Sequence, residues 1–339
     1  MPRPYSGSCP KQSASRNLPC WIATLTTEMK QPKKRRIRLR SVACSVAVLA
    51  MAAGLRAQAI QPADPTPPAI PADQLVREAV AREVAANDDT SFKYMFHARR
   101  QTPKGSQTHL YVETDDAMAG MLVAVNDQPL TAQQRKSEDD HLSWLINNPD
   151  QLRKKRVREK DETERSLRIV KALPDAFRYE YAGSETGTPG FGKTGDPLLK
   201  LNFTPNPNYQ PPSHVEQVLQ GMEGYLLIDA SAKRIARIDG TLFRDVSFGW
   251  GIIGHLDKGG HFRVQQAEVG DGHWDLSAMS LKMTGKILVF KSLNMVSDEV
   301  FTDFQRVPKD LTFAKAVEML KAEEEKTAHQ GETSSERKR

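Results

Sequence analysis

Cysteine and long apolar runs are scarce in this sequence. The chain of 339 residues has three cysteines, and all of them, Cys9, Cys20 and Cys44, lie among the first 59 residues. If that segment is removed, the remaining chain has neither disulfides nor thiol chemistry, which suits an oxidising compartment. No apolar run reaches the roughly 18 residues that suggest a membrane-spanning helix. The sequence therefore predicts no integral membrane span in the mature chain.

A basic excess is also lacking from most of the chain. The net charge of +6 comes from residues 1–59, which hold 11 of the 48 lysines and arginines and a single acidic residue, Glu28. Residues 60–339 carry 37 basic and 41 acidic residues, a net charge of −4. A domain of that charge has no general excess of cations with which to bind phosphate backbones. We therefore expect no nucleic-acid partner.

The first 59 residues contain the three parts of a bacterial-type signal peptide. A dense basic segment at 33–40 precedes an apolar stretch at 41–55, and Ala57 and Ala59 form an A-x-A cleavage site. The apolar stretch is short for an uncleaved anchor helix. Met29 would give a leader of ordinary length, so we expect it to be the true start. These features predict cleavage and export to the periplasm or the extracellular space.

Composition divides the rest of the chain into a linker, one folded domain and a tail. A proline-rich stretch predicts an extended linker, and a charged end with few apolar residues predicts disorder. The expected boundaries are 1–59 for the N-terminal extension and signal peptide, 60–71 for the linker, 72–325 for the domain and 326–339 for the tail, with a charged helical insertion at 131–172 and a Gly/Pro-rich loop at 183–213.

Periodicity within the domain predicts an α+β fold. Asp73 is a candidate N-cap of a helix that ends near Asn87, and Asn148-Pro149 divides the insertion into two helices. Short turns between alternating segments favour antiparallel neighbours. We expect eight to eleven strands in a strongly curved, half-barrel-like antiparallel sheet with packed helices. The expected strands are 92–100, 108–113, 118–125, 177–181, 198–203, 224–229, 234–238, 262–269, 274–283 and 286–293, and a last helix is expected at 313–321.

Residues 187–194 match the phosphate-binding pattern G-x-x-x-x-G-K-[ST] letter for letter. A functional loop of this kind opens directly into a helix whose first amides hold the phosphate. Here Gly195-Asp196-Pro197 follows, and this sequence does not propagate a helix. We therefore interpret the match as a flexible loop and not as a nucleotide site.

Three histidines, His255, His261 and His273, lie in one β-rich stretch, with Asp257 and Asp271 nearby. Their spacing matches no metal-binding motif such as H-E-x-x-H, and the chain has no G-x-S-x-G nucleophile motif. Histidines at turns and strand edges explain the pattern equally well. We therefore predict no metal site, no cofactor and no enzymatic activity.

A basic run, Arg-Lys-Lys-Arg-Val-Arg, occupies residues 153–158. An anion-binding patch is one interpretation of it. Acidic residues follow at once, at Glu159, Asp161, Glu162 and Glu164. We therefore favour a solvated helix face with ion pairs between residues four apart.

The most distinctive segment, Phe248–Leu256, places large apolar residues between three glycines. Glycines this dense permit sharp bends and close approach of the backbone. One interpretation is a long turn packed over the core, and the other is a mobile edge of an apolar cavity that contacts a hydrophobic ligand. The candidate lining residues, chosen for apolar bulk, are Trp250, Ile252, Phe262, Trp274 and Phe290.

Residues 221–307 resemble the C-terminal half of the bacterial lipoprotein-sorting and lipoprotein-carrier (LolA-like) superfamily. The matching features are the strand Gly224–Asp229, the strand at 234–238, and serial strands that end in Thr302–Phe304. The segments 205–212 (PNPNYQPP) and 258–262 (KGGHF) resemble a subgroup of uncharacterised exported proteins.

The resemblance implies a strongly curved antiparallel sheet around helices, with an apolar concavity that receives acyl chains. The chain departs from the compact carriers at 131–172 and 183–213, which puts the specific cargo in question. The sequence thus predicts an exported binding or carrier protein for a lipid or lipidated protein. The alternative is a non-catalytic envelope interaction module with a filled core that binds another protein.

Overall fold

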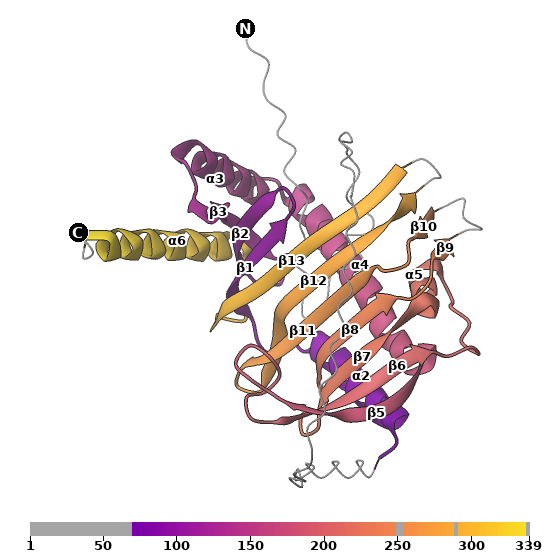
Figure 1. The fold of residues 1–339 in the computed structure, drawn as a ribbon. Helices are drawn as coiled ribbons and strands as arrows, with labels where there is room; N and C mark the ends of the chain where they lie inside the picture. Colours follow the sequence, from indigo (N-terminus) through magenta and orange to yellow (C-terminus); the bar gives the residue numbers. More distant parts are fainter. Residues whose placement is uncertain (1–69, 249–253, 288–290, 337–339) are drawn as a thin grey trace, which may run out of the picture.

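The structure, a computed structural model, describes residues 70–248, 254–287 and 291–336, with side chains as far as Lys326 except that of Ile287. This part of the chain has the mixed α+β architecture expected from the sequence. Thirteen strands form one sheet, in which all pairs of named strands are antiparallel, and five α-helices accompany it (Figure 1). None of the described helices is long and apolar enough to cross a membrane.

The helices begin and end at recognisable signals. The Thr131 hydroxyl accepts from the Gln134 amide at 3.3 Å, and the Gln134 side chain accepts from the Thr131 amide at 2.9 Å, a capping box. Asp73 lies in the first turn of α2, where a carboxylate is still favourable, because Pro71 takes the N-cap position. The helices are α2 (Ala72–Asp88), α3 (Ala132–Asn147), α4 (Pro149–Ala176), α5 (His214–Gln217), which continues into a 3-10 turn at Val218–Gly221, and α6 (Phe313–Glu336).

The strands follow one another mostly as hairpins. Their bounds are β1 (Tyr94–Thr102), β2 (Gly105–Val112), β3 (Ala119–Val125), β4 (Gln128–Pro129), β5 (Phe177–Thr186), β6 (Pro197–Pro205), β7 (Met222–Asp229), β8 (Ile235–Leu242), β9 (Val246–Phe248), β10 (Gly254–Leu256), β11 (His261–Gly270), β12 (His273–Ile287) and β13 (Lys291–Arg306). The count exceeds the predicted eight to eleven because β4, β9 and β10 have only two or three residues, too few for a recognisable alternation.

The order across the sheet is β4-β3-β2-β1-β13-β12-β11-β8-β7-β6-β5, with β9 and β10 attached beside β12. The path has two ends, so the sheet is open. The first and last long strands are neighbours at its centre, where Tyr94 of β1 lies opposite Arg306 of β13. The N-terminal strands β1–β4 therefore join the rest of the sheet through β13.

No turn forms at Thr284-Gly285, where the sequence predicts one. β12 continues through Gly285, which lies between Leu256 of β10 and Leu293 of β13. A Cβ atom on Gly285 would lie 2.1 Å from the carbonyl oxygen of His255. The glycine is thus required for the close approach of β10 and not for a change of direction.

The segment 183–213 is more regular than predicted. β5 and β6 both extend into it, so only 187–196 and 206–213 lie between elements on this side. Gly183, at φ 102°, lies in a β-bulge that lets β5 continue after an extra residue. At the other end of the chain, α6 runs to Glu336, past the predicted start of the tail, because good helix formers such as alanine, glutamate and lysine fill it.

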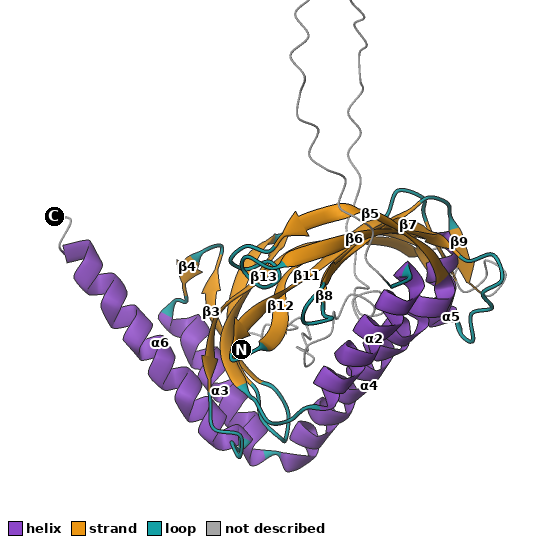
Figure 2. Ribbon diagram, turned by 90° about the horizontal axis from the view of Figure 1, so that it is seen from below, coloured by secondary structure: helices purple, strands orange, loops and turns teal. Residues whose placement is uncertain are grey.

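The largest apolar cluster lies between the sheet and the pair α2 and α4. Figure 2 shows these two helices lying across one face of the sheet. Neighbouring strand residues point to opposite faces, so Leu226 belongs to this helix–sheet cluster while Leu227 belongs to a separate cluster with Phe191. The helix–sheet cluster is the main core of the fold.

A second cluster lies at the other end of the molecule, where α3 and α6 pack on β2 and β3 (Figures 1 and 2). Leu142 and Leu145 of α3 meet Val317 and Leu320 of α6 there. The insertion predicted at 131–172 therefore contributes α3 to this core and α4 to the main one. It is an integral part of the fold.

Candidate functional site

A cavity of about 340 Å³ opens where α4, the end of α2 and the β2–β3 connection meet. Six acidic and two basic residues line it, so its walls carry an excess of negative charge. The lining residues are Asn87 and Asp88 of α2, residues 113–118, and Arg156, Glu159, Lys160, Thr163, Glu164 and Leu167 of α4.

The β2–β3 connection is shaped by one hydroxyl and one carboxylate. The Thr114 hydroxyl donates to the carbonyl of Ala117 at 2.7 Å and accepts from two amides of the same turn. The carboxylate of Glu159 accepts from the Met118 amide at 3.0 Å and from Lys155 Nζ at 2.5 Å. These bonds tie α4 to the start of β3 and fix one wall of the cavity.

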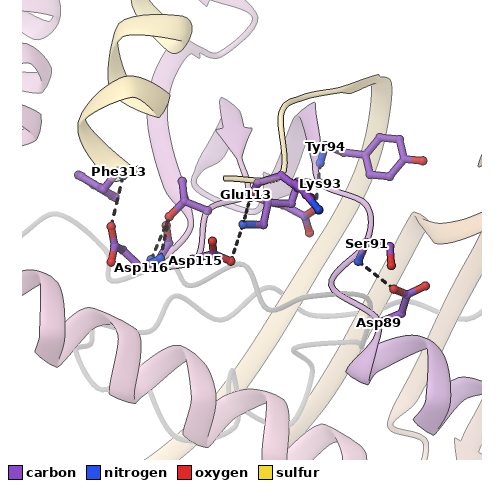
Figure 3. A network of polar contacts seen from close by, with 11 residues as sticks. Asp89, Ser91, Lys93, Tyr94, Glu113, Asp115, Asp116 and Phe313 are labelled. Carbon is purple, nitrogen blue, oxygen red and sulfur yellow. Dashed lines mark hydrogen bonds and ion pairs between the residues drawn. The ribbon is translucent and has the colours of Figure 1, made fainter. Parts of the chain in front are cut away.

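Lys93 places a buried cation beside this wall (Figure 3). Its ammonium group donates to the Asp115 carboxylate at 2.5 Å and to the carbonyl oxygen of Lys309. The next residue, Asp116, accepts from the amide of Phe313 at 3.4 Å. The connection is thus held to β1 on one side and to α6 on the other, and the buried ammonium has the partners that its burial requires.

Two buried carboxyl groups, Glu113 and Asp275, are close enough to influence each other's charge. Glu113 lines the cavity, and its Oε2 accepts from the Tyr94 amide at 2.9 Å (Figure 3). Burial raises the pKa of Asp275 well above its usual range and the charge of Glu113 raises it further, whereas the Leu276 amide and Arg234 oppose the shift. Asp275 therefore keeps its proton to a higher pH than an exposed aspartate does.

His273 extends this group of titratable side chains. Its ring stacks on that of Tyr94 with centroids 4.8 Å apart, and its Nε2 lies 4.0 Å from Asp275 Oδ2. Burial lowers the pKa of His273 and the charge of Arg234 lowers it further, while Asp89 has the opposite effect. The imidazole is therefore held in its neutral form to a lower pH than usual.

A buried ion pair links α2 to the sheet close by. The Arg234 guanidinium donates to both carboxylate oxygens of Glu83 at 2.9 and 3.0 Å. Gln266 accepts from Arg234 and donates to Glu83, both at 3.2 Å, and the Ile235 amide donates to Glu83 at 2.9 Å. Every oxygen of the Glu83 carboxylate is thus satisfied, as a buried charge requires.

The cavity matches a polar ligand with positive charge better than it matches an acyl chain, because carboxylates dominate its walls. Glu113 of this lining also contributes to the raised pKa of the buried Asp275. Within the described residues, no group of three or more histidine, aspartate and glutamate side chains is arranged to hold a metal ion.

The five candidate lining residues fall at different places. Phe262 is 4% exposed in the helix–sheet cluster, and Trp274 is 2% exposed in the cluster of Phe191 and Leu227. The structure therefore does not bring these two together. The other three candidates, Trp250, Ile252 and Phe290, lie outside the described residues.

The three histidines singled out in the sequence are also separate. His255 lies 3.2 Å from Asp257 and His261 lies 2.9 Å from Asp239, so each has a carboxylate of its own. The loop at 187–194 leads into β6 and not into a helix, as the sequence predicts. Its residues Thr188 and Phe191 form a tight turn, and Gly192 pairs with Ala267 of β11.

Sequence reasoning missed Glu83, Glu113 and Asp275. One signal was available, because Asp275 interrupts an apolar strand pattern at a position that the structure buries. A buried acid in a strand calls for a partner. The sequence does not show which partner, since Glu113 is contributed by a distant segment.

Comparison of the chain with protein-family models, with curated proteins and with solved structures finds no match in any of the three. Function is therefore inferred from the geometry of this chain.

Proposed function

We propose that the protein is an exported binding or carrier protein for a lipid or lipidated protein, with a sheet that curves strongly around α2 and α4. In this proposal the acyl chain enters the apolar layer between the sheet and these helices. The resemblance to the LolA-like superfamily supports the proposal, and so does the composition of the layer. No titrating residue is required, because burial of apolar area supplies about 25 cal/mol per Å².

The observation that carries the proposal is the extent of the helix–sheet cluster, the largest apolar cluster in the described residues, together with the methionines that it contains. Met222, Met279, Met283 and Met295 are all buried in it. Methionine side chains are unbranched and flexible, and they repack around guests of different shape more readily than branched side chains do. A layer of this kind can admit an acyl chain when α2 and α4 move away from the sheet.

A second candidate is an envelope interaction module with a filled core. Its support is the tight packing of Phe262 and Trp274, together with the acidic walls of the one cavity described above. In this case the apolar layer only stabilises the fold, and a protein partner binds elsewhere on the surface.

Mass spectrometry of an organic extract separates the two candidates. The mature chain is purified from a bacterial periplasm without detergent and in a folded state. We expect phospholipid or another acyl compound at about one molecule per chain. A clean extract, with no uptake of an added lysophospholipid, contradicts the carrier proposal and favours the interaction module.

Methyl NMR with labelled methionine then locates the bound chain. A long-chain lysophospholipid should shift the signals of Met279 and Met283, which lie in the helix–sheet cluster. Met95 and Met121 lie in the α3–α6 cluster and serve as matched controls that should not move. Equal shifts in both groups would indicate general loosening of the protein and would contradict a defined acyl site.

A further inference from the structure

Three of the four exposed large apolar side chains in the described residues lie on the last turn of α3 and the first turns of α4. Trp144 is 46% exposed, Ile146 is 38% exposed and Val157 is 53% exposed. All three lie near the junction of α3 and α4, and the fourth such residue in the described part of the chain is Val300 of β13.

The junction holds these side chains outward. The Asn148 side chain donates to the Trp144 carbonyl at 2.7 Å, and the Asn148 amide donates to the Leu145 carbonyl at 3.3 Å. Leu142 and Leu145 fill the core side of α3, so Trp144 and Ile146 are left on the outer sides. These hydrogen bonds therefore fix the end of α3 in an orientation that leaves Trp144 and Ile146 exposed.

Basic side chains flank Val157 on α4. Arg153, Lys154 and Arg158 are exposed on the first turns of α4, on either side of Val157, and Arg156, also exposed, lines the acidic cavity. Asp150 pairs with Arg153 at 2.8 Å. Within the described residues, no carboxylate lies within ion-pair distance of Lys154, Arg156 or Arg158, although the sequence favours ion pairs between residues four apart along this run.

The i,i+4 pairs of this region lie elsewhere on α4. Lys155 turns inward to Glu159, and Lys160 pairs with Glu164 one turn later. Exposed acidic residues on the same helix, Asp150 before the basic surface and Asp161 after it, limit that surface to the first turns of α4. A local positive surface thus stands on a domain whose overall charge is negative.

We propose that this corner, formed by Trp144, Ile146, Val157 and the basic residues of the first turns of α4, docks on an anionic phospholipid bilayer. Tryptophan favours the headgroup region of a bilayer, and short clusters of lysine and arginine are attracted to anionic lipid. The inference rests on the proposed function, because a carrier of lipid or lipidated protein must meet a membrane. It names the surface with which the carrier does so.

Vesicle sedimentation tests the docking surface with the full mature protein. We expect binding to vesicles that contain phosphatidylglycerol, much weaker binding to phosphatidylcholine vesicles, and loss of binding at high salt. Reversing two charges, Lys154→Glu with Arg158→Glu, should weaken partitioning by at least about 25-fold, because each lost basic residue alone costs about fivefold. Arg178→Glu, an exposed arginine on β5, is the matched control and should bind as the parent does.

A matched pair of valine substitutions tests the apolar contribution to vesicle binding. Val157→Ser should reduce binding severalfold, whereas Val300→Ser changes an equally exposed valine on β13 and should not. Tryptophan emission should shift to the blue on vesicles, and Trp144→Phe should abolish that shift. All three substitutions are at exposed positions, so the fold should be retained.

Three outcomes overturn the inference: no binding to either vesicle, equal binding to neutral and anionic vesicles, or equal loss in the corner and control variants. Binding to an acidic protein with no binding to vesicles would also overturn it. Vesicle binding and acyl content are measured separately. A clean organic extract with normal vesicle binding would contradict the carrier proposal and leave the docking surface standing.

Discussion

At the scale of single residues, two buried aspartates have opposite electrostatic environments. Asp275 lies near Glu113, and its raised pKa means that ionisation works against the folded state. Asp239 is also opposed by burial, but hydrogen bonds from Arg263 and His261 outweigh it and lower its pKa. The two carboxyl groups should therefore make stability depend on pH in opposite directions.

Asp275→Asn should stabilise the protein at pH 8. A carboxyl group whose pKa is raised by folding binds more protons in the folded state, so its contribution to stability falls as pH rises above the value of an unfolded aspartate. The amide keeps an oxygen for the Leu276 amide but carries no charge beside Glu113. We expect a gain of at least about 1 kcal/mol at pH 8 and a smaller one at pH 5, measured by urea unfolding.

Asp239→Asn should change the free energy of unfolding in the opposite direction. Its lowered pKa contributes stability above the pKa of an unfolded aspartate and loses that contribution as pH falls through the folded value. We expect a loss of roughly 1 kcal/mol at pH 7, which diminishes as the pH falls below the pKa of an unfolded aspartate and through the lower folded value. The same pH dependence in both variants would contradict the assignment.

Residues of this kind were the least predictable part of the molecule. The sequence shows that Asp275 sits in an apolar strand and that His273 lies close to it, but Glu113 and Glu83 come from distant segments. Burial and partners arise from the pairing of strands and from the placement of α2, which a single sequence does not specify. Phe262 and Trp274, candidates for a shared cavity lining, are both buried but in separate clusters, because the sequence shows the bulk of a side chain and not the cluster that it joins.

At the scale of elements, α2 is attached to the sheet by both apolar packing and the buried ion pair of Glu83 and Arg234. Removing one partner leaves the other charge buried without compensation. Glu83→Ala should therefore reduce the free energy of unfolding by about 3–5 kcal/mol. The measurement is urea unfolding, with amide exchange in α2 as a local readout.

The exposed pair of Arg77 and Asp175 gives the control for this prediction. It also involves α2, but both side chains are in water, so Arg77→Ala should cost no more than about 1 kcal/mol. The double change Glu83→Leu with Arg234→Met should recover much of the loss, because it removes both buried charges. If the double variant does not recover the lost free energy of unfolding, the ion pair must stabilise the fold by more than the mutual compensation of its two buried charges.

Element types were largely predictable and element ends were not. The break at Asn148-Pro149 is an exception, because a local signal in the sequence marks a real boundary between two helices. The expected turn at Gly285 was wrong because the same residue type serves close approach in a strand. The presence of a glycine does not show whether it forms a turn or allows two strands to approach closely.

At the scale of the whole molecule, β13 is the element that joins the two parts of the sheet. β1 pairs with β13 on one side and β12 pairs with it on the other. A chain that ends at Ile287 should therefore lose cooperative unfolding. One that ends at Lys326 should keep it, because Phe313, Val317 and Leu320 of α6 still cover the second core. Circular dichroism during urea unfolding distinguishes the two; two cooperative transitions in the shorter chain would contradict this view.

The bulge at Gly183 has a consequence for encounters between molecules. β5 is the edge of the sheet at its end of the path, and its outer backbone groups offer a template on which a strand of another chain could add. An added strand would follow the register of β5 only as far as Tyr181 and would have to shift before Ser184. The interruption limits any continuous ladder to about half of β5. Because the bulge allows only a short ladder of hydrogen bonds to an added strand, it should limit edge-to-edge aggregation at high protein concentration.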